Sequence, residues 1–478
     1  MKFVRNLACW GALCVTWACG PGERPGQGNG DAAVPDAGRP DASIGPTGIV
    51  SGTVWAPGNA PGLAPAGHEI PVFAAMAYLS LAAPAPIPQE VYCDRCVDPV
   101  GHYTFSDPKG NFQLKNIKPG TYWLVIQKGQ FRLDQQVVVE GNQTLALPTR
   151  NTTLPSQHDP ANGKWVPRIA LAEGNYDQLE DILGKMGMGT VDDEGALVAS
   201  SIPENLHMYK NVGSILGEGY GTGKFGAAHR GTLNDLVADL SKMSQYHIIF
   251  VPCSAGPNTE LFSKPAYREN IRKYVQAGGK FYVTDWSAEW EDVVFPEFIR
   301  FVADHDTPPG AGQSQFNKGD GGGVESTPDY PRAYNSFNAK AEHEELNEWL
   351  NNQVGPLVTI SDLGTIDYSK TGVMDANNFA VEGNWNRIEE TPSVVIGTNE
   401  ENMPVRSQGQ HWVVGDWSKG DSVRHPLTVT FEPGGCGRVL FSTYHTTEDA
   451  HAGLVPQERV LLYLIMEIGV CKSGPIIE

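Results

Sequence analysis

Residues 246–253, YHIIFVPC, contain a continuous apolar run that decides the fold class of this chain. Such a run is typical of a strand covered by helices on both faces, because a strand with one solvent-facing side alternates polar and apolar residues. The stretch 280–284, KFYVT, has the same character, and a helical repeat over 265–277 lies between the two. The order strand, helix, strand predicts neighbouring parallel strands of an α/β sheet.

The same alternation extends to both sides of this core. Further strands are predicted at 168–172 and 437–444, and further helices at 176–188, 233–243 and 455–468. We therefore predict a doubly wound α/β domain over 168–472. It is interrupted by an insert at about 286–410 that does not continue the pattern.

Three segments of this region carry a resemblance to a known superfamily. They are residues 246–251 (YHIIFV), 271–283 (IRKYVQAGGKFYV) and 437–445 (GRVLFSTYH). Together they resemble the class I glutamine amidotransferase-like superfamily, including its ThuA-like branch, which implies a flavodoxin-like fold. Glutaminase chemistry in that superfamily needs a Cys on a tight elbow after a strand, and this position reads Val283-Thr284-Asp285-Trp286 here. The resemblance therefore implies the fold without the glutaminase activity.

Two hypotheses concern Cys253, His445 and Glu448. His445 and Glu448 occupy places similar to the His and Glu of the superfamily, and Cys253 follows a neighbouring strand. The three side chains could form a hydrolase-like triad at the carboxyl ends of the strands, where open α/β sheets bind their ligands. In the alternative, which the missing elbow Cys favours, Cys253 is a buried small apolar residue and His445 caps a strand end.

The same edge of the sheet is the predicted ligand site. The side chains expected there are Ser254, Asp285, Trp286, Glu289 and Trp290. Carboxylates accept hydroxyl hydrogen bonds and Trp rings stack on flat surfaces, so this set suits a sugar or a peptide. Two alternatives stay open: Asp285, Glu289 and His445 hold a divalent metal, or Trp286 and Trp290 only form the apolar face of a short helix.

The N-terminal region predicts export. Residues 1–19 combine a positive start with a short apolar stretch, as in a secretory signal. The end of that stretch, TWAC at 16–19, resembles a lipobox with Thr at the usual Leu position, which implies lipidation of Cys19. No Asp follows Cys19, so the resemblance implies an outer-membrane lipoprotein, facing the periplasm or the surface. Residues 20–47 are rich in Gly, Pro, Asp and Ala, and we expect a disordered tether.

Residues 48–149 predict an antiparallel β-sandwich. Short alternating stretches at 49–55, 110–114, 121–126 and 136–139 are separated by Gly and Pro turns. The segment 107–124, DPKGNFQLKNIKPGTYWL, resembles the core motif of carboxypeptidase regulatory-like (transthyretin-like) domains. That resemblance implies a non-catalytic spacer with a carbohydrate-binding-like fold. Residues 150–167, with three prolines, are predicted to form the linker to the α/β domain.

Four cysteines are predicted to form two local disulfides. Cys93 and Cys96 are close in the chain, and an exported protein meets an oxidising compartment, so we expect a bond between them. Cys436 precedes an outgoing strand and Cys471 follows a returning helix of similar length, which predicts a second bond, Cys436–Cys471. Cys253 is then the free thiol.

Composition narrows the function. The chain has 478 residues with a formal net charge of −20, and without clustered cations a nucleic-acid partner is excluded. No cofactor is expected. The favoured hypothesis is a lipid-anchored cell-envelope protein whose α/β domain is a binding or interaction module for a glycan, peptidoglycan or an envelope protein. The alternatives are a hydrolase-like enzyme acting on a sugar or a peptide, and a carbohydrate-binding protein with an exposed platform of Trp385, Trp412 or Trp417.

Overall fold

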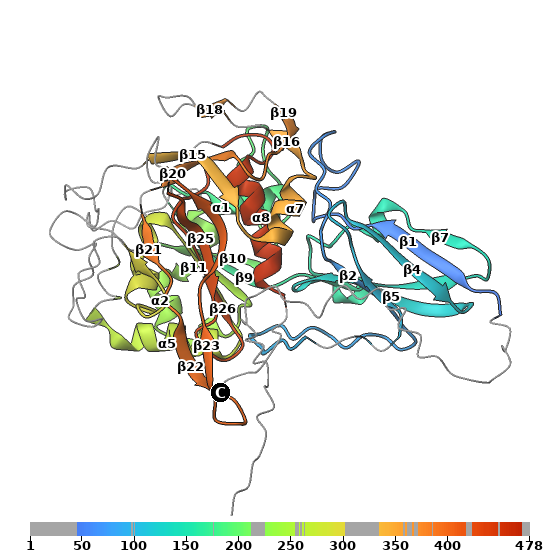
Figure 1. The fold of residues 1–478 in the computed structure, drawn as a ribbon, viewed down its shortest axis with the longest axis horizontal. Helices are drawn as coiled ribbons and strands as arrows, with labels where there is room; N and C mark the ends of the chain where they lie inside the picture. The colour runs from blue at the N-terminus through green and yellow to red at the C-terminus, as the bar shows by residue number, and fades with distance from the viewer. Residues whose placement is uncertain are drawn as a thin grey trace, which may run out of the picture.

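The computed structural model of the chain (Figure 1) describes most of the chain from residue 45 onward. The described residues are 45–96, 99, 101–174, 176–211, 225–253, 258, 261, 263–301, 334–356, 359–360, 366–367, 371–384, 386–416, 423–447 and 450–470, with the backbone alone at 286, 334–337, 356, 359–360, 366–367 and 371. The predicted signal with Cys19, and Ser254, Trp385, Trp417, Glu448 and Cys471, lie outside them. Most elements are strands in several sheets, accompanied by seven helices in the described part of the chain.

Two sheets form the sandwich predicted for the N-terminal part. One has the order β4-β1-β7 and the other the order β3-β2-β5-β6-β8. Their strands are β1 (Gly48–Thr53), β2 (Met76–Ser80), β3 (Tyr103–Phe105), β4 (Asn111–Ile117), β5 (Gly120–Lys128), β6 (Phe131–Val139), β7 (Thr144–Ala146) and β8 (Lys164–Trp165). Residues of both sheets belong to one hydrophobic cluster, among them Phe112 and Leu124. Strand β8 lies within the segment predicted as a linker and pairs with β6.

The motif at 107–124 begins with a tight hairpin. Asp107 Oδ1 accepts hydrogen bonds from the backbone N–H groups of Lys109 and Asn111 at 2.9 and 2.8 Å. Gly110 has φ +78°, and a Cβ there would lie 2.6 Å from Val54 O. Both the backbone conformation and the close approach require glycine, which explains the spacing of Asp107 and Gly110.

A ten-stranded sheet forms the second body, in the order β11-β10-β9-β12-β13-β26-β25-β24-β15-β20. The first six strands are parallel and the last four continue the sheet antiparallel. The strands are β9 (Ile169–Ala172), β10 (Leu206–Lys210), β11 (His229–Thr232), β12 (Ile248–Val251), β13 (Lys280–Thr284), β15 (Tyr334–Ala341), β20 (Phe379–Asn384), β24 (Gln410–Gly415), β25 (His425–Phe431) and β26 (Arg438–Ser442). The prediction of a parallel sheet is therefore right for only six strands, and the predicted insert supplies β15 and β20.

Helices cover both faces of this sheet. They are α1 (Leu179–Lys185), α2 (Leu233–Val237), α3 (Leu240–Met243), α5 (Pro265–Gln276), α6 (Glu289–Asp292), α7 (Glu344–Leu350) and α8 (Pro456–Ile468). Ile248 and Phe250 of β12 pack in the cluster with α1 and α8, whereas Ile249 and Val251 pack in the cluster with α2 and α5. This alternation explains why the strand is apolar at every position. No helix in the described ranges is long and apolar enough to cross a membrane.

Small two-stranded ribbons complete the region predicted as an insert. They pair β14 (Arg300–Phe301) with β21 (Ile388–Glu390), β16 (Val354–Pro356) with β19 (Thr371–Val373), β17 (Thr359–Ile360) with β18 (Ile366–Asp367), and β22 (Val394–Thr398) with β23 (Pro404–Ser407). Their antiparallel pairing needs only short connections.

The two bodies share one hydrophobic cluster. It includes Phe73 and Leu79 of the sandwich together with Trp349 of α7 and Leu461 of α8, and Figure 1 shows α7 and α8 on the side of the sheet that faces the sandwich. A salt bridge of 2.5 Å joins Lys128 to Glu467, both almost fully buried. A spacer that moves freely would have neither contact, so the bodies form one packed unit.

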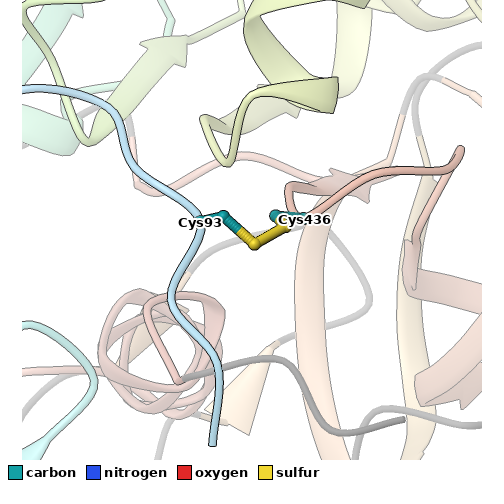
Figure 2. The surroundings of a disulfide bond; sticks show 2 residues. All are labelled: Cys93 and Cys436. Carbon is teal, nitrogen blue, oxygen red and sulfur yellow. A yellow bond between two sulfur atoms is a disulfide. The ribbon is translucent and has the colours of Figure 1, made fainter. Parts of the chain in front are cut away.

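A disulfide also joins the two bodies, and it corrects both predicted pairings. Cys93 bonds to Cys436 with their Cα atoms 5.1 Å apart (Figure 2), so the bonds Cys93–Cys96 and Cys436–Cys471 are wrong. Cys96 is disulfide-bonded as well. The pairing is long-range because the loop before Cys93 runs along the α/β body: Val91 N donates to Ser244 O at 2.7 Å.

Candidate functional site

The candidate site lies at the carboxyl edge of the parallel strands. Strands β9, β12, β13 and β26 end side by side there, and Glu173, Cys253, Asp285 and His445 follow their last residues. The chain order of the strands reverses between β9 and β12. Open α/β sheets bind ligands in the crevice outside such a point, so this edge is where a functional site is expected.

Asp285 occupies a strained turn between a strand and a helix. It directly follows β13 and begins the short helix η5 (Asp285–Ser287), which leads into α6. Its φ of +41° is in the left-handed region, which costs a non-glycine residue about 1–3 kcal/mol. The geometry of an elbow is therefore present at the position where the sequence lacks a Cys, and an aspartate stands on it.

The carboxylate of Asp285 contacts both members of the proposed triad that the structure describes. Its Oδ2 lies 3.7 Å from Cys253 Sγ and 3.7 Å from His445 Nε2. Cys253 Sγ and His445 Nε2 are therefore at most twice that distance apart. The triad of Cys253, His445 and Glu448 stays a prediction, because its acid, Glu448, lies outside the described residues.

His445 is oriented by backbone atoms. Its Nδ1 contacts the carbonyl oxygen of Thr446, and its own carbonyl accepts a hydrogen bond of 2.6 Å from Gln457. Because a carbonyl only accepts, Nδ1 carries a proton, and Nε2 is the ring nitrogen that faces Asp285. Gly383 of β20, at φ +71°, permits this arrangement, since a Cβ there would lie 2.6 Å from Nε2.

Asn386 completes the surroundings of Asp285. Its Nδ2 donates to the backbone oxygen of Asp285 at 2.5 Å and to Oδ1 at 3.3 Å. Asn386 is fully buried, and its own Oδ1 has no hydrogen-bond partner among the described residues. His445 Nε2 likewise has none with hydrogen-bond geometry in the described part of the chain. Two buried polar atoms next to one carboxylate are thus available to a ligand.

A buried aspartate, Asp177, connects the carboxyl ends of β12, β13 and β26 through hydrogen bonds. Thr284 Oγ1 donates to Asp177 and accepts from Cys253 N at 2.8 Å. The other oxygen of Asp177 accepts from Thr446 N and Oγ1 at 3.1 and 2.7 Å. These bonds fix the turns that carry Cys253, Asp285 and His445.

The sequence analysis missed Asp177, Gly383 and Asn386. Asp177 could have been found from its place just after the strand at 168–172. Gly383 and Asn386 lie in the region that the sequence analysis treated as an insert. The pairing of β20 with β15 brings this segment to the site, and a single sequence does not reveal that pairing.

The other predicted ligand residues have structural roles or fall outside the description. Glu289 is buried and accepts a hydrogen bond from Asn258 N at 2.8 Å, and burial raises its pKa to about 8. Trp290 is buried and packs against Phe281, so the apolar-face alternative holds for this ring. The backbone of Trp286 is helical, and its side chain is outside the description.

Two further hypotheses, the metal site and a sugar platform at Trp412, do not fit the described residues. Among the described residues no three His, Cys, Asp or Glu side chains gather in a way that could hold a metal ion. Asp285, Glu289 and His445 therefore do not form the suggested metal site. Trp412 is buried and donates to Thr430 Oγ1 at 2.8 Å, so it offers no exposed platform to a sugar.

Comparisons with known proteins do not assign the chain to a family. No protein-family model matches the chain, and no curated protein is significantly similar to it. The function is therefore inferred from the geometry at Asp285.

Proposed function

We propose that the α/β body is a hydrolase-like enzyme in which Asp285 is the nucleophile and His445 the general base. The observation that carries the proposal is the aspartate on a strained elbow with Nε2 of His445 3.7 Å from its carboxylate. Strained backbone at a strand-to-helix turn is how α/β hydrolases present a nucleophile. Carboxylates also serve as nucleophiles, most familiarly in glycosidases.

The strand order supports the flavodoxin-like fold that the sequence resemblance implies. Numbered along the chain, the strands β9, β10, β12, β13 and β26 lie in the order 2-1-3-4-5, which is the flavodoxin-like order. Strand β11 and the antiparallel strands extend it on either side. We propose that this body is related to the class I glutamine amidotransferase-like superfamily, with Asp285 in place of the elbow Cys.

The proposed reaction has two steps. Oδ2 of Asp285 forms a bond to the electrophilic saturated carbon of the substrate, and the leaving group departs with the bonding electrons and takes a proton from solvent. His445 Nε2 then removes a proton from water, whose oxygen attacks the Asp285 carboxyl carbon. The ester bond breaks, the product alcohol takes the proton from His445, and Asp285 returns a proton to solvent. A glycoside, with its electrophilic anomeric carbon, is the proposed substrate class.

A panel of aryl glycosides and aryl esters tests this proposal on the purified chain lacking residues 1–19. We expect release of the aryl alcohol from at least one glycoside, and loss of that release in Asp285→Asn, because an amide is a poor nucleophile. An absence of turnover and of any covalent adduct across the panel would overturn the proposal.

A second candidate function is the non-catalytic binding module. The burial of Cys253, Asp285 and His445 favours it, because the described residues leave these side chains little contact with solvent. The same panel separates the candidates: a glycan that raises the melting temperature without being cleaved supports binding.

We also propose that the protein is exported and lipid-anchored, with the sandwich as a carboxypeptidase regulatory-like domain. The leader at 1–19 and the disulfide Cys93–Cys436 support export, since such bonds persist in oxidising compartments.

Replacing Cys19 by Ser tests the anchor. We expect the variant to lose incorporation of radiolabelled palmitate and to move from the membrane fraction to the soluble fraction, because the acylated side chain is gone. Cys14→Ser, in the same leader, is the matched control and should change neither. Unchanged labelling in Cys19→Ser would refute lipidation at this residue.

A further inference from the structure

Arg459, in the first turns of α8, is a buried cation with unused hydrogen-bond donors. The residue is 1% exposed, and its Nε donates to Leu454 O at 3.2 Å. Neither Nη1 nor Nη2 has a hydrogen-bond partner among the described residues. Burying a charged group without partners is strongly unfavourable. A bound hydrogen-bond acceptor at this guanidinium would reduce that cost.

Arg459 has no ion-pair partner among the described residues. The carboxylate of its chain neighbour Glu458 raises the pKa of Arg459, but this carboxylate pairs with Lys185 at 3.6 Å and with His451 at 3.1 Å. Burial lowers the pKa of Arg459 to about 10, which still leaves the guanidinium charged at neutral pH. The Glu458 carboxylate is thus engaged by Lys185 and His451 and is not in an ion pair with Arg459.

His68 brings a third donor from the sandwich. Its Nδ1 is buried and lacks a hydrogen-bond partner in the described ranges. Burial and then the Arg459 charge lower the pKa of His68, and the Glu69 charge raises it, so His68 of the sandwich lies within electrostatic reach of Arg459 on α8. The residue as a whole is partly exposed.

The ribbon of β16 and β19 closes the other side of the guanidinium. A Cβ on Gly355 would lie 1.7 Å from Nη2. The guanidinium therefore rests directly on the backbone of Gly355, and no larger residue fits there. This contact holds the planar group in place without using its donors.

We propose that the junction between the sandwich and the α/β body binds an oxyanion, held by Nη1 and Nη2 of Arg459 and by Nδ1 of His68. Two parallel N–H groups on a rigid planar fork match the two oxygens of a carboxylate or a phosphate group. The anion would pair with the positive charge of the Arg459 guanidinium. It would also bridge the two bodies, so binding stabilises the packed unit and not only one part of it.

Thermal unfolding of the full mature chain at constant ionic strength tests this site. Inorganic phosphate, sulfate and acetate are titrated separately against chloride. We expect a saturable rise in melting temperature of about 3 °C for the anion that fits. A response to acetate alone identifies a carboxylate ligand, and a response to phosphate and sulfate identifies a phosphoryl-type ligand.

Variants separate this site from general salt effects. Arg459→Lys keeps the charge and loses the fork, so we expect the shift to fall by at least half. Arg272→Gln removes a half-exposed arginine paired with Glu297 and should retain the full shift. If Arg459 variants do not fold, His68→Phe, in a partly exposed loop, gives the same comparison. Equal shifts in the wild type and in these variants, or no shift with any of the three anions, would overturn the proposal.

Discussion

Replacement of His445 by Gln is expected to trap the chain as a covalent ester on Asp285. Without Nε2 no base activates water for the second step, whereas the attack by Asp285 remains. The first turnover should release about one equivalent of aryl alcohol per protein, followed by a steady rate lowered about 10³-fold, within the range of general-base effects. Intact mass spectrometry should show the added glycosyl group, and peptide mapping should place it on Asp285.

Two control variants make this result specific. Asp285→Asn should show neither the burst nor the adduct. His411→Gln replaces a half-buried histidine on β24 that hydrogen-bonds to Thr391 at 2.9 Å, away from Asp285, and it should keep the wild-type rate. An adduct on Cys253 instead of Asp285 would show that the thiol is the nucleophile, contrary to the proposed mechanism.

Removal of the disulfide between the two bodies is expected to lower the free energy of unfolding by about 3–5 kcal/mol. Cys93 and Cys436 are separated by 343 positions, and a bond that closes so long a loop strongly restricts the unfolded chain. Because Cys96 is also disulfide-bonded, the variant replaces Cys93, Cys96 and Cys436 together by Ser.

Urea unfolding monitored by tryptophan fluorescence measures this effect. The midpoint of the triple variant should fall, and the wild type in a strong reductant should unfold at the same midpoint. Cys253→Ser, which alters a buried free thiol, serves as the control for the exchange of sulfur by oxygen. A triple variant as stable as the oxidised wild type would show that packing alone holds the two bodies together.

The strands of the parallel core were predictable from the sequence because both of their faces are buried. The apolar run at Ile248–Val251 and the stretch Lys280–Thr284 are β12 and β13. The helical structure of residues 233–243 was predictable, but its division into the two helices α2 and α3 was not. Asp239 caps α3 by accepting from Ser241 N and Lys242 N, and this local competition ends α2 early.

The long-range features were not predictable from one sequence. The cysteine pairing depends on where the loop before Cys93 lies, and local spacing carries no information about that. Of the candidate site, Cys253, Asp285 and His445 were found because each follows a predicted strand. Asn386 and Gly383 reach the same edge through β20, whose position next to β15 no periodicity reveals.

The shared hydrophobic cluster has a consequence for how this chain can be divided. A protein shortened to begin at residue 168 would leave the side of α8 that packs on the sandwich, together with Trp349, facing water. It would also leave Glu467 without Lys128. Such a fragment should aggregate unless the sandwich is supplied in trans. We therefore expect the two bodies to fold and unfold as one unit, although each has the architecture of a separate domain.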